Sequence, residues 1–197
     1  ATDNSTVYNA VVSDKDGSAD MALLNALKVD AAGLSPSEFA SGVTVLENAI
    51  TADDNATATF PHLSNLGNVN AAFSTADMAG TDGVYVSQQA GTLASYSVVS
   101  VGGKLIGLVG VASPDIDNVS SIGTLSISPD NDTVPATASD IAVTVQTAVN
   151  TLRAANIDKI VLLSHLQDIA LEKGLPAELY DVDIIVAGGS GTRMGDS

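Results

Sequence analysis

His165 and His62 are the only two histidines among the 197 residues, so they are the first candidates for acid–base or metal chemistry. His165 ends a buried apolar run, where an imidazole can bind a divalent metal ion. A lone histidine at a strand end more often makes structural hydrogen bonds, and both interpretations stay open. Its neighbour Ser164 cannot be its nucleophile, because adjacent strand residues point to opposite faces. His62 follows Pro61 and is predicted to be a loop residue without a chemical role.

Other polar and glycine-rich segments offer weaker chemistry. Residues 188–191, Gly-Gly-Ser-Gly, follow a predicted strand and could cradle a phosphate, but they lack the lysine of a P-loop, which favours a turn. Two acidic loops, Asp53-Asp54-Asn55 and Asp130-Asn131-Asp132, could bind Ca²⁺ loosely, although neither has EF-hand spacing. The absence of cysteine excludes disulfides, zinc–thiolate sites and thiol nucleophiles.

The charge balance limits the partners. With 23 acidic and 7 basic residues the formal charge is −16, which disfavours nucleic acid and anionic membranes. No apolar run reaches the roughly 18 residues of a membrane-spanning helix. The polar start Ala-Thr-Asp-Asn-Ser-Thr suits a mature N-terminus after signal cleavage, so we expect a secreted or extracellular protein, with the bacterial periplasm and cell surface as alternatives. Four glycosylation sequons, at Asn4, Asn55, Asn118 and Asn131, are readily explained by chance in so polar a chain.

Hydrophobic periodicity predicts alternating helices and strands. Ser35, Pro36 and Glu38 form a capping box for a helix that we expect to run to about Ile50. The Gly102-Gly103 pair between two apolar runs predicts a β-hairpin. The other expected helices are residues 20–28, 138–155 and 168–174, and the expected strands are residues 29–34, 57–66, 94–101, 104–113, 124–128, 159–164 and 182–186. The last two strands are so apolar that we expect both to be central strands, covered on both faces.

Several of these segments, taken in order, resemble metallophosphoesterase domains of the 5′-nucleotidase kind. Residues 35–42, Ser-Pro-Ser-Glu-Phe-Ala-Ser-Gly, stand where that family has Gly-Asn-His-Glu-Phe-Asp-x-Gly, and residues 60–66 are similar to its Phe-Pro-x-Leu-Ser-x-Asn-Leu. Residues 101–110 look like its strand–turn–strand, and residues 160–165 resemble the strand that ends in a metal-ligating histidine. Residues 187–192, Ala-Gly-Gly-Ser-Gly-Thr, stand in place of its Gly-Gly-His-Ser-His-Thr.

The resemblance implies a two-metal phosphatase site that has lost most of its ligands. In the family, an asparagine that bridges to a metal stands at Pro36, and a histidine that contacts the phosphoryl group stands at Ser37. Gly189 and Gly191 replace two ligating histidines, and the sequence contains no Asp-x-His motif. Proline and glycine offer no ligating side chain, so His165 remains as a residual metal ligand. We therefore expect no catalytic residues and no cofactor, with a divalent metal as the alternative.

The same resemblance implies an α/β fold: mixed β-sheets packed with outer helices in an αββα sandwich, incomplete at the N-terminus. Residues 1–19 are expected to be an arm and residues 20–197 the degenerate domain. The favoured function is a non-catalytic, secreted structural or interaction protein, a pseudoenzyme. The alternative is a segment of an active metal-dependent 5′-nucleotidase or phosphatase hydrolysing phosphate monoesters, with the missing ligands outside this chain. A solute-binding module has no sequence feature of its own behind it.

Self-assembly is the last expectation. A sheet without its first strand has an uncovered edge, and a short apolar segment near the start of the chain could fill it by strand addition, in the same or a neighbouring subunit. A head-to-tail contact of this kind generates filaments unless its rotation closes a ring. We therefore expect a homo-oligomer or filament whose contact residues are Val7, Tyr8, Ala10, Val11 and Val12.

Overall fold

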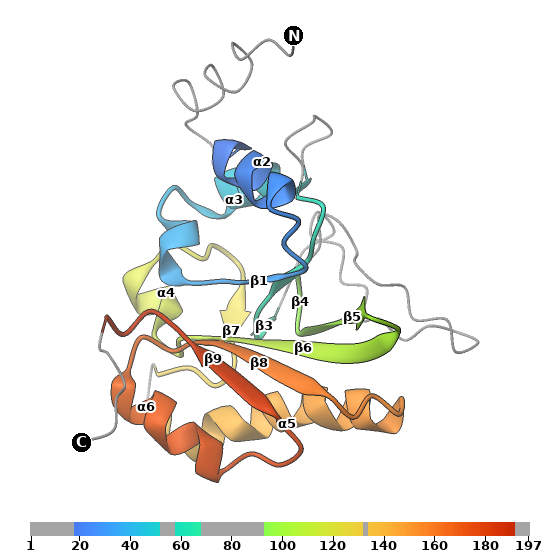
Figure 1. Ribbon diagram of the computed structural model, residues 1–197. Helices are drawn as coiled ribbons and strands as arrows, with labels where there is room; N and C mark the ends of the chain where they lie inside the picture. Colours follow the sequence, from blue (N-terminus) through green and yellow to red (C-terminus); the bar gives the residue numbers. More distant parts are fainter. Residues whose placement is uncertain (1–17, 52–57, 68–92, 132–133, 192–197) are drawn as a thin grey trace, which may run out of the picture.

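The chain forms four layers, in the order helix, sheet, sheet, helix (Figure 1). The computed structural model describes residues 18–51, 58–67, 93–131 and 134–191. The layers confirm the predicted α/β class and the αββα arrangement.

The larger sheet has the strand order β5-β6-β8-β9. Its first two strands form an antiparallel hairpin through Gly102 and Gly103, whose φ angles of 57° and 77° suit glycine, so the predicted hairpin is confirmed. The other neighbours are parallel, and Ala112 pairs with His165 at the carboxyl ends of β6 and β8. The strands are β5 (Tyr96–Val101), β6 (Lys104–Ala112), β8 (Ile160–His165) and β9 (Ile184–Ala187).

Two helices, α5 (Ala138–Ala154) and α6 (Ile169–Gly174), cover one face of this sheet. Thr137 caps α5 in a reciprocal capping box with Asp140, and Asp168 caps α6 by accepting from the N–H groups of Ala170 and Leu171. A short 3-10 turn, η3 (Leu175–Ala177), follows α6. The buried stripe of α5 packs on alternate residues of β8, and its members are Ile141, Ala142, Val145, Ala148, Val149 and Leu152.

The opposite face packs on a small parallel sheet, β1-β2-β4. Its strands have two residues each: β1 (Ala32–Gly33), β2 (His62–Leu63) and β4 (Leu93–Ala94). The two sheets approach closely at Gly110 of β6, where an added Cβ atom would lie 2.4 Å from the carbonyl carbon of Leu63. The remaining elements are α2 (Ser18–Ala26), η1 (Pro36–Phe39), α3 (Val43–Thr51), α4 (Ile116–Val119) and the antiparallel pair β3 (Leu66–Gly67) with β7 (Ser126–Ile127).

Three sequence-based predictions are wrong. The helix expected from Ser35 to Ile50 is two helices, because Gly42 adopts a φ of 91° between η1 and α3. His62 lies in β2 with 2% of its surface exposed, because its fully buried neighbours Phe60 and Leu63 place this segment in the core, where β2 pairs with β1. The strand expected at 182–186 is not central: β9 is an edge strand of the described sheet, with Ile184 56% exposed.

Some predictions fall on residues that the structure does not describe. These are the N-terminal contact segment at residues 7–12, most of the expected arm at 1–19, and the acidic loop at 53–55. The second acidic loop is described only in part, since Asp132 lies outside. Within the described ranges, no helix has the length and apolar character needed to span a membrane.

Candidate functional site

The candidate site lies where the parallel strands β6, β8 and β9 end. Carboxyl ends of parallel strands share one edge of a sheet, and the loops beyond them form the usual crevice for a ligand. The register places Ala112 beside His165, and Ser164 beside Ala187. His165 and the glycine-rich segment after β9 are thereby brought together, as their positions in the predicted strands require.

The His165 imidazole lies directly against the backbone of the glycine-rich segment. A Cβ atom built on Gly189 would lie 2.4 Å from His165 Nε2 and 2.6 Å from its Cδ2. It would also lie 3.0 Å from Cγ of Gln167. The φ of Gly189 is 92°, a conformation that side-chain-bearing residues rarely adopt. The ring therefore fills the space in which a side chain at position 189 would begin.

A buried carboxylate that the sequence analysis missed holds the end of β8. Glu172, 3% exposed, accepts hydrogen bonds from the Ser164 hydroxyl at 2.8 Å and from the Leu166 N–H at 3.0 Å. Buried carboxylates need such partners, so this pair of bonds fixes the backbone on both sides of His165. The one signal in the sequence is an acidic residue on the inner face of the helix, three positions before the buried Leu175.

The segment around η1 is built as a capped turn. Ser35 is its N-cap, Pro36 takes the first helical position, and the Ser35 N–H donates to the Glu38 carboxylate at 2.6 Å. The hydroxyl groups of Ser35 and Ser37 are hydrogen-bonded to each other at 2.6 Å. The side chains of this turn therefore satisfy one another, with Pro36 buried beneath them.

His62 lies apart from this site in apolar surroundings. Its ring is tilted against that of Phe60, with the centroids 5.1 Å apart, and its Nδ1 has no hydrogen-bond partner among the described residues. Burial disfavours the imidazolium and lowers the pKa of His62 to about 4, so the ring is neutral at physiological pH.

No group of three or more histidine, aspartate or glutamate side chains is placed to hold a metal ion anywhere in the described ranges. Of the four positions that the sequence resemblance assigns to metal ligands, His165 has an imidazole, and the others are Pro36, Gly189 and Gly191. These residues do not fit a dinuclear metal centre, which needs several oxygen and nitrogen ligands around one cavity. Gly191 has a φ of 64°, and no atom of the described residues lies within 4 Å of a Cβ built on it, so among these residues only its backbone conformation restricts a side chain.

The comparisons with known proteins agree with the fold. The chain is 30% identical over 171 residues to human 5′-nucleotidase and 28% identical to the bovine enzyme. It superimposes on the 5′-nucleotidase precursor of Thermus thermophilus with a TM-score of 0.67 and 28% identity, covering 92% of this chain and 30% of that one. The chain is a 5′-nucleotidase-like metallophosphoesterase domain.

Two further solved structures share the fold of this nucleotidase-like domain. They are the NAD nucleotidase of Haemophilus influenzae, with a TM-score of 0.61 at 25% identity, and a putative 5′-nucleotidase of Staphylococcus aureus, with a TM-score of 0.57. The latter is 14% identical, which shows a common fold alone. No family model matches the chain. The alignments cover 87% of this domain but 25% of the human and bovine enzymes, so it spans about a quarter of their length.

Proposed function

We propose that this nucleotidase-like domain is a non-catalytic, secreted interaction module. The contact between His165 and Gly189 carries the proposal, since the ring occupies the space of a missing ligand side chain. A histidine at position 189 would need both a strained φ and a displaced His165. The backbone conformation at Gly189 therefore supports the proposed loss of a ligand, in addition to the residue type.

The capped turn at η1 supports the same proposal. Pro36 and Ser37 stand at two further family positions, and their roles are structural: one begins the helix and the other closes a hydroxyl pair. A site that binds two metals and a phosphate ester must present free ligands at these positions. In this turn the polar side chains are instead hydrogen-bonded to one another and to the backbone of the turn.

An active enzyme is the competing function, favoured by the 30% identity to human 5′-nucleotidase. Because this chain spans about a quarter of that enzyme, further ligands can lie in polypeptide outside residues 1–197. In that case His165 would be one metal ligand of a larger site, and its imidazole would have to turn away from Gly189.

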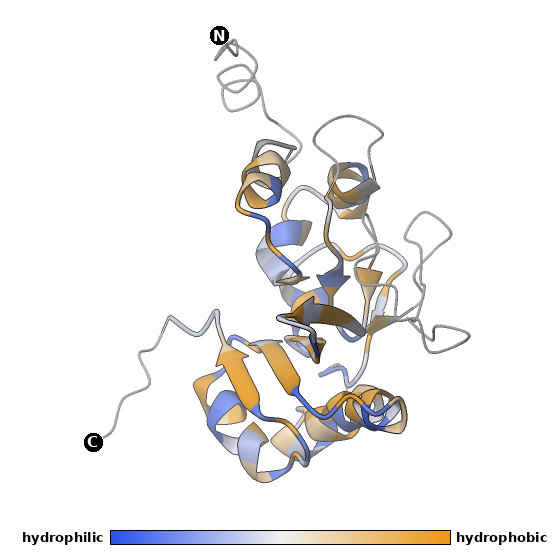
Figure 2. Cartoon of the chain, turned by 45° about the vertical axis from the view of Figure 1, so that its right-hand side comes forward, coloured by the Kyte–Doolittle hydropathy of each residue, from blue (hydrophilic) through white to orange (hydrophobic). Residues whose placement is uncertain are grey.

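Self-assembly is the form of interaction that we propose. In the described sheets β1 and β9 are edge strands, and β9 exposes Ile184 and Val186 at 56% and 54%. Figure 2 shows the strands near the C-terminus as strongly hydrophobic. Uncharged edge strands accept added strands, and residues 7–12 supply a short apolar segment without charge. Secretion accords with the precursor status of the Thermus relative.

Hydrolysis of AMP and p-nitrophenyl phosphate, with Mn²⁺, Zn²⁺ or Ca²⁺ added, tests the non-catalytic part. We expect no turnover by residues 1–197, and none by a His165→Ala control. Metal-dependent turnover by residues 1–197 that His165→Ala abolishes would refute the non-catalytic proposal.

Light scattering tests the assembly. The full chain should grow in mass when salt or Ca²⁺ is added, because screening weakens the repulsion between subunits of charge −16. Deletion of residues 1–12 should leave a monomer under the same conditions. A full chain that stays monomeric with Ca²⁺, or a deletion that assembles equally well, contradicts the strand-addition contact.

A further inference from the structure

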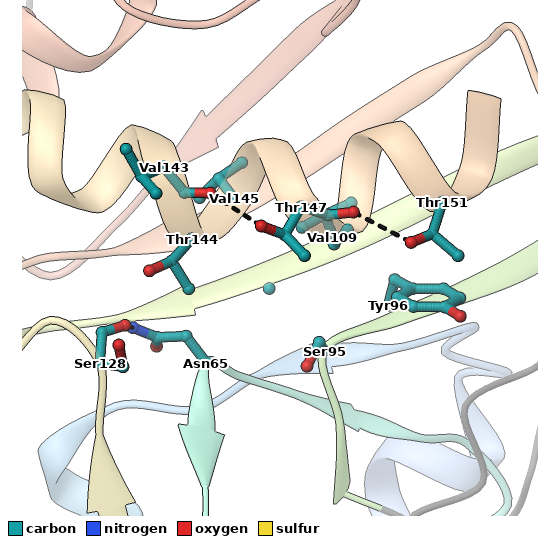
Figure 3. A pocket seen from close by; sticks show the side chains of 12 residues that line it. Asn65, Ser95, Tyr96, Val109, Ser128, Val143, Thr144, Val145, Thr147 and Thr151 are labelled. Atoms are coloured by element: carbon teal, nitrogen blue, oxygen red, sulfur yellow. Dashed lines mark hydrogen bonds between the residues drawn. The ribbon is translucent and has the colours of Figure 1, made fainter. Parts of the chain in front are cut away.

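An open groove of about 440 Å³ lies between α5 and the segment that leads into β5. Figure 3 shows its walls: Thr144, Thr147 and Thr151 project from the helix, and Ser95 and Ser128 lie opposite. Its volume is within the range of small-molecule sites, about 300–1,000 Å³. Several separate chain segments therefore contribute hydroxyl groups to one concave surface.

None of the described residues that line the groove is charged, although the chain carries 23 acidic and 7 basic residues. A phosphate or a carboxylate would find no cation there, and a cationic ligand would find no carboxylate. The lining is instead a mixture of hydroxyl groups and small apolar side chains. Such a surface selects a neutral ligand.

The hydrogen bonds already made by the lining residues restrict the kinds of ligand that the groove can bind. The hydroxyls of Thr147 and Thr151 donate to the helix carbonyls of Val143 and Thr147, each at 3.0 Å, so these oxygens offer the groove only lone pairs. A ligand that meets them must donate hydrogen bonds. Among the lining residues of the strands, Asn65 Oδ1 accepts a hydrogen bond from the Ala112 N–H at 2.8 Å, and the Gly110 N–H donates to the Ser95 carbonyl. Because these backbone N–H groups are already hydrogen-bonded, an extended peptide cannot add to the sheet here.

The face of α5 that lines the groove consists of residues with low helix propensity. Val143, Thr144, Thr147 and Thr151 are all β-branched, and such residues are poorer helix formers than the residues usual on an exposed face. Val143 is 69% exposed, so core packing does not explain its type. Short side chains with restricted χ1 angles leave the groove open and lower the entropy lost on binding.

We propose that this groove binds a neutral saccharide. A sugar carries many hydroxyl donors, no charge, and apolar C–H faces that suit the exposed Val143 beside the threonines. The residues that line the groove include neither His165 nor any residue of the edge strands β1 and β9. The saccharide proposal can therefore fail while the proposed assembly holds, and the reverse.

Saturation-transfer NMR on the full chain tests the site with maltose, cellobiose and N,N′-diacetylchitobiose as probes. Thr147→Arg and Thr144→Arg fill the groove from the helix, and Asn150→Arg adds the same charge on an exposed residue of α5 outside the groove. Far-UV circular dichroism confirms that each variant is folded. We expect transfer to at least one disaccharide, weakened roughly tenfold by either groove variant and unchanged by the control.

AMP and inorganic phosphate serve as charged competitors. Neither should displace the bound sugar, because the groove has no cation to hold a phosphate. The proposal is overturned if none of the three sugars shows transfer, if transfer persists in both folded groove variants, or if AMP competes.

Discussion

The buried His62 should make the stability of the protein depend on pH in a way that one substitution removes. Folded His62 has a pKa of about 4, whereas an unfolded chain titrates near the ordinary value of 6.5. Between these two pH values the unfolded state binds the additional proton. Stability is therefore fully present above about pH 6.5 and is lost as the pH falls toward 4.

The size of the effect follows from the two pKa values. At about 1.36 kcal/mol for each pKa unit, the full loss is about 3 kcal/mol once the pH is below both values. At pH 5 the loss is already about 2 kcal/mol, because nearly all unfolded chains but few folded ones carry the proton. This is a large part of the 5–15 kcal/mol that stabilises a typical domain.

Urea unfolding followed by far-UV circular dichroism at pH 7.5, 6 and 5 measures this loss. The acidic residues also titrate at low pH, so the informative quantity is the difference between the wild type and His62→Leu, an apolar residue that does not titrate. That difference in unfolding free energy should shift by about 2 kcal/mol between pH 7.5 and 5. Parallel profiles for the wild type and His62→Leu would refute the burial argument.

Three further substitutions test close contacts by urea unfolding at neutral pH. Gly110→Ala should cost about 3 kcal/mol, because its methyl group would collide with a backbone carbonyl, whereas the control Gly33→Ala meets its nearest atom at 3.6 Å and should cost less than about 1 kcal/mol. Gly189→Ala should lower the unfolding free energy through both backbone strain and a clash with the His165 ring. Adding His165→Ala should recover only the part due to the clash. Additive changes in unfolding free energy for the two substitutions would exclude the contact. Glu172→Gln should cost about 1–3 kcal/mol, since one amide oxygen cannot replace two accepting oxygens; an unchanged midpoint would contradict the network.

Local signals in the sequence predicted the elements whose stability is local. The helix at 138–154 has a regular apolar stripe with Asp140 in its first turn, and the hairpin at 102–103 has a glycine pair in its turn. Both elements therefore lie within a residue or two of their expected positions. The family order of motifs likewise predicted the layered fold. The helix and the hairpin depend on residues close together in the chain.

Features that depend on distant segments were not predictable in the same way. The break at Gly42 looked like the interior of a helix, since a single glycine is tolerated in such a pattern. The apolar composition of β9 does not distinguish a central strand from an edge strand, because the neighbours decide it. The contact of His165 with Gly189 and the groove beside Thr147 arise only when separate strands and helices pack together.

The connectivity of the larger sheet sets an order in which it can form. β5 and β6 are joined by a two-residue turn, whereas the pairing of Gly107 with Ile160 closes a loop that includes α4, β7 and α5. Closing the long loop costs more chain entropy, so we expect the β5–β6 hairpin to form before β8 pairs with β6. During that interval the β6 edge is open and apolar. Pulse-labelled hydrogen exchange should therefore protect β5 amides early and β8 and β9 amides together, later, with the waiting hairpin as the aggregation-sensitive species.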